Sequence, residues 1–200
     1  MTTPKAHLVD DDEAIRDALA WLLQSRGLPH ACYDSAENFL AAWQPATSGC
    51  VVLDMRMSGM TGLDCFDRLC QLGSTLPVIF LTGHGDVPLA VATLKKGAFD
   101  FFEKPLNDNE LATRIEEALA HDARQRAANA TVDSVKSLIS KLTTRERQIM
   151  ELVLAGKYNK VIADELNISM RTVEVHRANL FEKMQVKTAV ELANLLKPDH

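Results

Sequence analysis

The sequence predicts an α/β domain, with an open, doubly wound parallel sheet, followed by a small all-α domain. Over residues 1–122, short apolar runs alternate with amphipathic stretches, the pattern of strands and covering helices in a parallel sheet. From residue 138 onward, every segment has the periodicity of a helix. A length of 200 residues with 46% hydrophobic content fits one large or two small soluble domains.

The α/β domain divides into five strand–helix units. The predicted strands cover residues 6–10, 30–34, 50–54, 77–81 and 99–103, and the predicted helices cover residues 13–26, 35–43, 62–72, 87–96 and 108–122. Asp34 follows the second strand directly, where its short carboxylate side chain predicts the N-cap of the second helix. Five such units make a doubly wound sheet with helices on its faces.

The second half of the chain predicts a helical linker and a compact helical domain. Residues 123–137 contain neither glycine nor proline, so a helical linker is expected between a first domain of residues 1–122 and a second of residues 138–200. Thr143 and Glu146 have the spacing of a capping box, and Gly156 marks the end of the helix that they open. Three or four short helices are expected in this domain.

Charge and composition limit the classes of function. Residues 1–121 hold 9 Lys and Arg against 17 Asp and Glu, a balance of −8, whereas residues 136–200 hold 11 against 8, a balance of +3. An acidic first domain and a mildly basic second one suggest a cation site and a nucleic-acid contact respectively. No apolar run is long enough for a membrane span and no signal peptide is evident, so a cytoplasmic protein is expected. The four cysteines have no CxxC spacing and are expected to be reduced.

Ionisable side chains gather at the carboxyl ends of the predicted strands. Asp10 and Asp11 follow the first strand, Asp54 ends the third, Thr82 follows the fourth and Lys104 follows the fifth. In open α/β sheets ligands bind at this edge, and three clustered carboxylates need a counter-charge. Oxygen ligands without histidine or cysteine favour Mg²⁺, and a hydroxyl and an ammonium beside it would complete a cradle for a phosphoryl group.

Each of these residues also has a structural explanation when taken alone. The acidic run at residues 10–13 can serve a helix N-terminus, where negative charge is favourable. Asp54 can be a turn residue, and Lys104, which precedes Pro105, can lie in a surface turn. Caps and turns do not readily explain why all of them converge on one edge of one sheet.

The stretches VDDD, LDMRMSGMTG, FLTGHGDVP and FFEKP occur in this order, and with them the first domain resembles a CheY-like receiver. The resemblance implies a five-stranded sheet of order 2-1-3-4-5, with Asp54 as the acceptor of a phosphoryl group from a sensor histidine kinase. Asp10, Asp11, Asp54 and the main-chain carbonyl of Arg56 would hold Mg²⁺. The remaining implied roles are a phosphoryl-oxygen contact for Lys104, a hydrogen bond for Thr82, an inward turn of the switch residue Phe101 and a cis Lys104–Pro105 bond.

The same resemblance implies a regulated surface and exposes two unusual positions. The face formed by the fourth helix, fifth strand and fifth helix would be remodelled and would dimerise. Ser58 stands where receivers usually carry proline, which leaves the rigidity of its loop and the lifetime of the phosphoryl group open. His84, near the expected mouth of the site, matches a branch of the family, although a catalytic role is not expected of it.

Residues 159–184 predict a helix-turn-helix, with Ser169 as the N-cap of the second helix. At 100° per residue, Val173, Leu180 and Met184 share an inward face. The opposite face, free to enter a major groove, comprises Arg171, Glu174, Val175 and Ala178, flanked by His176, Asn179, Lys183 and Arg177 near phosphates. A generic three-helix core would show the same periodicity.

The segment LTTRERQIMELVLAGKYNKVIADELNISMRTVEVHRANLFEKM resembles the DNA-binding domain of LuxR-type regulators. Together with the receiver, it makes the chain similar to NarL/FixJ response regulators, with RTVEVHRAN and TGHGDVP typical of the FixJ branch. The resemblance implies that Lys160, Thr172, Val175, His176, Arg177 and Lys183 lie near DNA. Glu174 replaces a lysine found in some relatives, so their base preferences do not transfer.

The sequence therefore predicts a two-component response regulator in which phosphorylation of Asp54 promotes dimerisation and binding to promoter DNA. It would be no enzyme beyond its own phosphorylation and dephosphorylation, and RNA polymerase is a further candidate partner. One alternative is a constitutive DNA-binding protein whose receiver only dimerises. Another is a phosphatase of the haloacid-dehalogenase kind, which needs an acid/base aspartate where this chain has Arg56.

Overall fold

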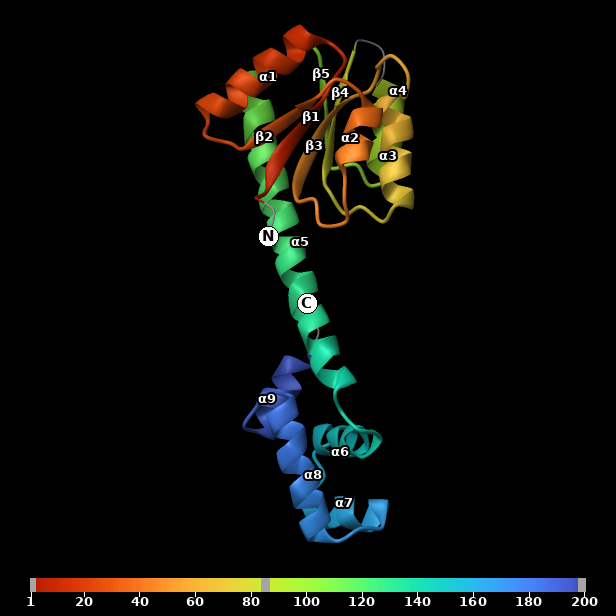
Figure 1. Cartoon of the computed structure of the whole chain (residues 1–200), viewed down its shortest axis with the longest axis vertical. Coiled ribbons are helices and arrows are strands. Elements are labelled where there is room, and N and C mark those ends of the chain that lie inside the picture. The colour runs from red at the N-terminus through yellow and green to blue at the C-terminus, as the bar shows by residue number, and fades with distance from the viewer. Residues whose placement is uncertain (1–2, 84–86, 198–200) are drawn as a thin grey trace. The chain divides into compact units, whose positions relative to one another are not determined.

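The structure is a computed structural model of the whole chain, and it describes residues 3–83 and 87–197. The chain divides into two compact units, residues 1–126 and 127–200, which are described in turn. The first unit contains a five-stranded, all-parallel sheet of order β2-β1-β3-β4-β5, which confirms the predicted order (Figure 1). The strands are β1 Lys5–Val9, β2 His30–Tyr33, β3 Gly49–Asp54, β4 Val78–Thr82 and β5 Asp100–Glu103, each within one residue of its predicted ends.

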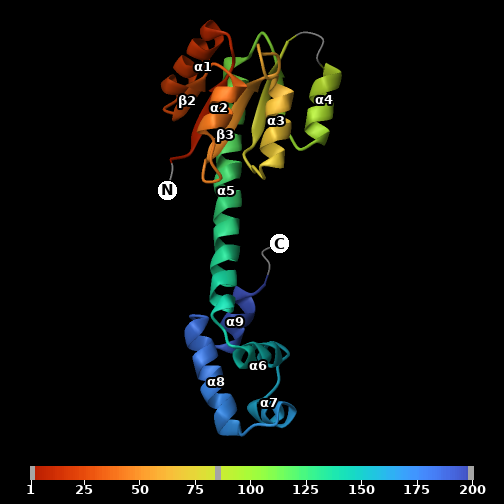
Figure 2. The same cartoon turned by 45° about the vertical axis from the view of Figure 1, so that its right-hand side comes forward.

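The helices cover both faces of this sheet, with α1 and α5 on one side and α2, α3 and α4 on the other (Figures 1 and 2). Four of them agree with the predicted ranges to within one residue: α1 Glu13–Ser25, α2 Ala36–Ala42, α3 Gly62–Gln71 and α4 Val87–Lys95. The fifth predicted helix and the predicted linker form one continuous helix, α5 Asp108–Ser140. The absence of glycine and proline between residues 123 and 137 explains why it is not interrupted.

Alternating side chains of the central strands form the two halves of the core. Val51, Leu53 and Phe80 point to the side of α2 and α3, where they pack with Phe39 and Phe66. The residues that alternate with them along the strands point to α1 and α5. On that side Leu8, Val52, Ile79 and Leu81 pack with Leu23, Leu111 and Ile115. Because β1, β3 and β4 are buried on both faces, they read in the sequence as continuous apolar runs.

The N-cap of α2 corrects one prediction. Ser35, and not Asp34, is the N-cap, and its hydroxyl accepts a hydrogen bond from the Asn38 amide. Asp34 supports the same turn by accepting hydrogen bonds from the Ser35 hydroxyl and the Asn38 side-chain amide. Both residue types can cap a helix, and the backbone places the serine one residue before the first helical residue.

The second unit contains four short helices after the end of α5, α6 Thr144–Leu154, α7 Asn159–Leu166, α8 Met170–Lys183 and α9 Ala189–Leu195 (Figure 2). The capping box of Thr143 and Glu146 is present, and Ser169 caps α8 as predicted. Asn167, in the left-handed conformation, ends α7 and makes the tight joint with α8. The predicted inward residues are all fully buried in one core with α6, α7 and α9: Val173 and Leu180 of α8, and Met184, its C-cap.

The cysteines and the helices of the described residues bear on two further predictions, that of reduced thiols and that of no membrane span. All four cysteines are free thiols, and Cys50 and Cys65 are buried. None of the described helices, α5 included, combines the length and the apolar character that a membrane span requires.

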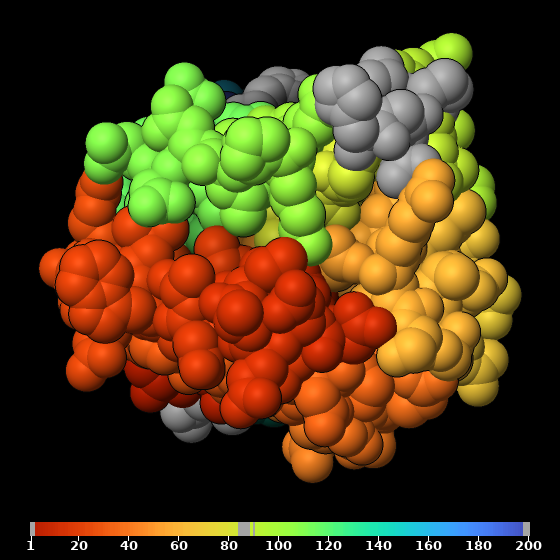
Figure 3. All heavy atoms as spheres, turned by 90° about the horizontal axis from the view of Figure 1, so that it is seen from above, coloured from red at the N-terminus to blue at the C-terminus, as the bar shows by residue number. Residues whose placement is uncertain are grey.

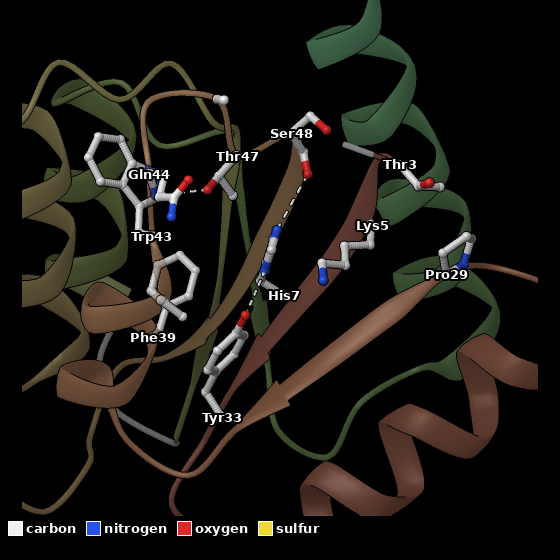
Figure 4. Close-up of a pocket in the computed structure, with 12 residues that line it drawn as sticks. Thr3, Lys5, His7, Pro29, Tyr33, Phe39, Trp43, Gln44, Thr47 and Ser48 are labelled. Atoms are coloured by element: carbon white, nitrogen blue, oxygen red, sulfur yellow. Dashed lines mark hydrogen bonds between the residues drawn. The ribbon is translucent and has the colours of Figure 1, made fainter. Parts of the chain in front are cut away.

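A buried histidine lies beside a cavity at the amino ends of β1 and β2. Figure 4 shows the His7 ring between Tyr33 and Ser48, with Nδ1 3.4 Å from the Tyr33 hydroxyl and Nε2 3.4 Å from the Ser48 carbonyl oxygen. His7 is 2% exposed. Burial is the main cause that lowers its pKa, and Lys5 acts in the same direction, whereas the Ser48 hydrogen bond and Asp122 oppose it.

We expect His7 to make the stability of the first unit fall as the pH drops. Because its folded-state pKa is below its unfolded value of 6.5, folding favours the neutral ring, and this contribution is lost as the pH falls from 6.5 toward the folded pKa. Urea unfolding at about pH 7.5 and about pH 5.5 checks this. The loss between the two should be smaller in His7→Gln than in wild type. His30→Gln is the control on the neighbouring strand, and an equal loss in all three proteins would contradict the account.

Candidate functional site

The parallel strands bring three carboxylates together at the carboxyl edge of the sheet. Each of Asp10, Asp11 and Asp54 offers a ligand oxygen, and these oxygens lie within 4.8 Å of one another. Asp10 is 2% exposed and Asp54 is 5% exposed, whereas Asp11 faces solvent. In Figure 3, which looks down on this edge, the segments near residues 10, 55 and 105 (red, orange and light green) meet around a hollow. The predicted cluster is therefore formed, and one of its members is open to water.

Lys104 places an ammonium against the two buried carboxylates. Its Nζ atom lies 2.6 Å from Asp54 Oδ1 and 3.0 Å from Asp10 Oδ2. The peptide bond between Lys104 and Pro105 is cis, as the resemblance implied. Lys104 lies in a bend directly after β5, as its structural explanation proposed, and from there its side chain also makes both of these contacts.

The pKa values of this group reflect competition between burial and pairing. Burial is the largest effect on Asp54 and raises the pKa of its carboxyl, and the nearby Asp10 adds to the rise, whereas the Lys104 hydrogen bond opposes it. Burial alone would lower the pKa of Lys104, but hydrogen bonds to Asp54 and Asp10 outweigh it and the pKa is raised. The ammonium therefore stays charged and offsets part of the cost of the two buried carboxylates.

Two further predicted residues lie on the strands beside this cluster. Thr82 is 1% exposed, and its hydroxyl donates a hydrogen bond to the Gly83 carbonyl oxygen at 3.1 Å. Phe101 is partly buried and packs against the half of the core that contains α2 and α3. It therefore belongs to the margin of the core in this structure. His84 lies outside the described residues.

The backbone around the cluster holds the carboxylates in place. The Asp12 amide donates to Asp10 Oδ1 at 2.9 Å, and the Arg56 amide donates to Asp54 Oδ2 at 2.9 Å. Asp12 is itself the N-cap of α1, because its side chain accepts the Ala14 amide. The acidic run thus has both of the functions considered for it, since Asp12 caps the helix while Asp10 and Asp11 belong to the cluster.

Sequence reasoning missed two contacts at the site. Arg16, one turn into α1, donates from Nη1 to the Asp10 carbonyl oxygen at 2.7 Å. Ser58 donates to Asp11 Oδ2 from its amide at 2.7 Å and from its hydroxyl at 2.8 Å. These two bonds are the main cause of a lowered pKa for Asp11. The sequence marks Ser58 as unusual, but it does not show which residue the serine contacts.

The donor set fits a hard divalent cation. Three carboxylates with no histidine or cysteine among them suit Mg²⁺, which binds oxygen and keeps several waters. The exposure of Asp11 gives such an ion access from solvent. Asp10, Asp11, Asp54 and the Arg56 carbonyl would hold it, as expected from the resemblance. No other group of three such side chains meets the same spacing among the residues that the structure describes.

The second unit presents the predicted face of α8 to solvent. The four residues expected to face a major groove are all exposed, as is the flanking Asn179: Arg171, Glu174, Val175 and Ala178. His176 is partly exposed, and Lys160 is exposed on α7. Thr172 is partly exposed at the start of α8, where its amide donates to the Ser169 hydroxyl oxygen. This helix therefore exposes a face of two charged and two apolar side chains.

Two flanking cations of α8 also contribute to the packing of the unit. Lys183 Nζ lies 2.7 Å from Oε2 of Glu146, the buried member of the capping box. Arg177 donates from Nη1 to the Asn159 side-chain oxygen at 2.8 Å and stacks over Phe181. Both residues lie at the edge of the predicted face, and their spacing along the helix does not reveal these partners.

Comparison with known proteins matches both units. Residues 6–116 match the model of the response regulator receiver domain, and residues 140–196 match that of bacterial regulatory proteins of the luxR family. The chain is 43% identical over 195 residues to the transcriptional regulatory protein FixJ of Bradyrhizobium diazoefficiens. The aligned region covers 96% of this chain and 95% of the relative. It is 45% identical over 192 residues to the C4-dicarboxylate transport transcriptional regulatory protein DctR of Rhodobacter capsulatus. This alignment covers 94% of this chain and 97% of the relative.

Solved structures of response regulators also align with nearly the whole chain. The response regulator StyR superposes with a TM-score of 0.93 at 39% identity, covering 98% of each chain. Full-length FixJ from B. japonicum gives a TM-score of 0.60 at 42% identity, covering 98% of this chain and 96% of the other.

Proposed function

Because the chain belongs to the response regulators that join a receiver to a LuxR-type DNA-binding domain, we propose that Asp54 is the phosphoryl acceptor that controls its binding to promoter DNA. As a member of this family, the chain is a two-component response regulator of transcription. One observation carries the proposal beyond that. Lys104 Nζ lies 2.6 Å from Asp54 Oδ1, in a cluster whose two other carboxylates can hold a cation.

The chemistry assigned to Asp54 is nucleophilic attack on a phosphohistidine of a sensor histidine kinase. A carboxylate oxygen of Asp54 forms a bond to phosphorus while the bond from phosphorus to the histidine nitrogen breaks. Lys104 opposes the rise in the pKa of Asp54 that burial causes, and it can pair with a phosphoryl oxygen afterwards. A bound Mg²⁺, held by Asp10, Asp11, Asp54 and the Arg56 carbonyl, would supply positive charge for the transferred group.

Phosphorylation of Asp54 would change the conformations of Thr82 and Phe101. The Thr82 hydroxyl, now bonded to Gly83, would turn to donate to a phosphoryl oxygen, and Phe101 would move further into the core. The surface of α4, β5 and α5 would then dimerise. Its α4 part already exposes apolar side chains, Leu89, Val91 and Leu94, which supports this assignment.

DNA binding is assigned to α8 of the second unit. Its exposed face would enter the major groove, with two copies on half-sites one helical turn apart. Base edges would meet Arg171, Glu174, Val175 and Ala178. Six residues would contact phosphates and groove edges: Lys160, Thr172, His176, Arg177, Asn179 and Lys183. In this structure Lys183 is paired with Glu146.

The remaining assignments follow from the same scheme. We propose a receiver of residues 1–122, a helical linker of residues 123–137 and a DNA-binding domain of residues 138–200. The protein would act in the cytoplasm and meet RNA polymerase at the promoter. Its only catalysis would be its own phosphorylation and dephosphorylation, because the family is one of regulators rather than enzymes.

Phosphoryl uptake tests the assignment of Asp54. Treated with acetyl phosphate and Mg²⁺, the wild-type protein should become phosphorylated, and Asp54→Asn should not, because the amide is not a nucleophile. Phosphate-affinity gel electrophoresis measures the modified fraction. Asp12→Asn is the matched control and should be modified like wild type, since Asp12 caps α1 outside the cluster. Wild-type uptake by Asp54→Asn would overturn the proposal.

A further inference from the structure

Ser58 makes a two-point contact with Asp11 across the mouth of the site. The Ser58 amide and hydroxyl donate to the same oxygen, Asp11 Oδ2, at 2.7 Å and 2.8 Å. The contact joins the segment after β1 to the loop after β3, 47 residues apart in sequence. Since both donors come from one residue, the serine determines where that carboxylate oxygen lies.

The loop that carries Ser58 is fixed at two other points. Its ends are closed by a hydrogen bond from the Gly62 amide to the Met55 carbonyl oxygen at 3.2 Å. Its tip is bound to α2 through the Met60 amide, which donates to Glu37 Oε1 at 2.9 Å. Ser58 is thus presented from an anchored loop, and it can hold Asp11 in place rather than follow its movements.

Asp11 is the member of the carboxylate cluster that needs such a restraint. Asp10 and Asp54 are buried and bonded to Lys104, whereas Asp11 is exposed. An exposed carboxylate on a free side chain samples several rotamers, and restricting it costs conformational entropy when a ligand binds. In the contact with Ser58 its ligand oxygen already lies within 4.8 Å of the other two.

The hydrogen bonds from Ser58 also connect Asp11 to the loop that follows Asp54. Ser58 follows Arg56 by two residues in the same loop, and the Arg56 amide is bonded to Asp54 Oδ2. Residues on both sides of the expected cation site are therefore connected through one short, anchored segment.

We propose that Ser58 is a positioning residue for the divalent cation of this site, holding Asp11 in a metal-binding arrangement before the ion arrives. The proposal rests on the assignment of the receiver site above and adds a residue to it. Proline at this position has no amide hydrogen and no hydroxyl, so it would remove both bonds. Alanine would remove only the hydroxyl bond, and threonine would retain both donors.

Calorimetric titration of the metal-free, full-length protein with Mg²⁺ tests the proposal. Relative to wild type, Ser58→Ala should bind Mg²⁺ about threefold more weakly and Ser58→Pro about tenfold more weakly, as expected for the loss of one and two charge-assisted bonds at an exposed site. Ser58→Thr should be close to wild type. Ser74→Ala is the matched control, because it removes a serine hydroxyl that accepts a hydrogen bond in the α3–β4 loop.

Ser58→Ala and Ser58→Pro that bind Mg²⁺ as tightly as wild type would overturn the proposal. Tighter binding would also overturn it, because it would mean that Ser58 withholds Asp11 from the ion. Urea unfolding of each variant establishes that it is folded. In metal-free protein the Ser58 amide should exchange slowly with solvent, and Asp11→Ala should abolish that protection.

The outcomes separate this proposal from the proposed function. If wild type neither binds Mg²⁺ nor takes up phosphate from acetyl phosphate, the assignment of the receiver site fails and this proposal falls with it. If wild type does both and the Ser58 variants behave like it, only the role of Ser58 is refuted.

Discussion

Lys104→Met is expected to lower the free energy of unfolding of the first unit at neutral pH by about 1–3 kcal/mol in the absence of Mg²⁺. The variant keeps most of the aliphatic stem but leaves two buried carboxylates, Asp10 and Asp54, without their counter-charge. Loss of one partner from a fully buried pair costs more, but the Lys104 side chain is 25% exposed, so water screens part of the effect. Urea unfolding of the metal-free protein measures it.

Both pH and metal should change the size of this loss in a defined direction. Burial and Asp10 already raise the pKa of Asp54, and removal of Lys104 raises it further. A carboxyl whose folded pKa lies above its unfolded value is unfavourable at neutral pH, and the penalty disappears as the pH falls through the folded pKa toward the unfolded value. The deficit of Lys104→Met should therefore shrink on acidification. Added Mg²⁺ should also reduce it, because the ion binds the folded state and supplies the variant with the counter-charge that it lacks.

The matched control for this prediction is Lys96→Met. Lys96 Nζ lies 2.9 Å from Asp67, a comparable distance, but both side chains are about half exposed. Exposed pairs contribute about 0–1 kcal/mol, so this variant should differ little from wild type. A Lys104→Met protein as stable as wild type and insensitive to Mg²⁺ would show that Lys104 does not balance the carboxylates.

The cluster of carboxylates was predictable because it follows from topology alone. Parallel strands bring their carboxyl ends to one edge, so Asp10, Asp54 and Lys104 have to meet once the strands are located correctly. The buried face of α8 was predictable for a similar reason. A regular helix fixes the directions of Val173 and Leu180 from their spacing, without knowledge of any partner.

The contacts that escaped prediction depend on loop conformation and on residues distant in sequence. Ser58 reaches Asp11 only because the loop after β3 folds over the end of β1, which no local pattern reveals. Lys183 pairs with Glu146 across 37 residues. The error at Asp34 has a different origin, since two adjacent residues can both cap a helix and the choice depends on the local backbone.

Asp54→Asn is expected to abolish the response of DNA affinity to phosphorylation while leaving the basal affinity nearly unchanged. The substitution removes the nucleophile from the first unit and changes nothing on α8, which is part of the second unit. The control is Arg171→Ala, which removes an exposed cation from the proposed DNA-binding face. It should weaken binding with and without phosphorylation, because its effect lies on the DNA-binding face and not on the switch.

DNA affinity with and without phosphorylation tests the central claim most directly. The probe is a fluorescent duplex selected from a random pool by wild-type protein treated with acetyl phosphate, and anisotropy is read at fixed salt concentration. Acetyl phosphate and Mg²⁺ should tighten wild-type binding by about tenfold or more, within the usual range of coupling between two sites, and should not change the affinity of Asp54→Asn. An unchanged wild-type affinity, or an equal gain in Asp54→Asn, would contradict the account.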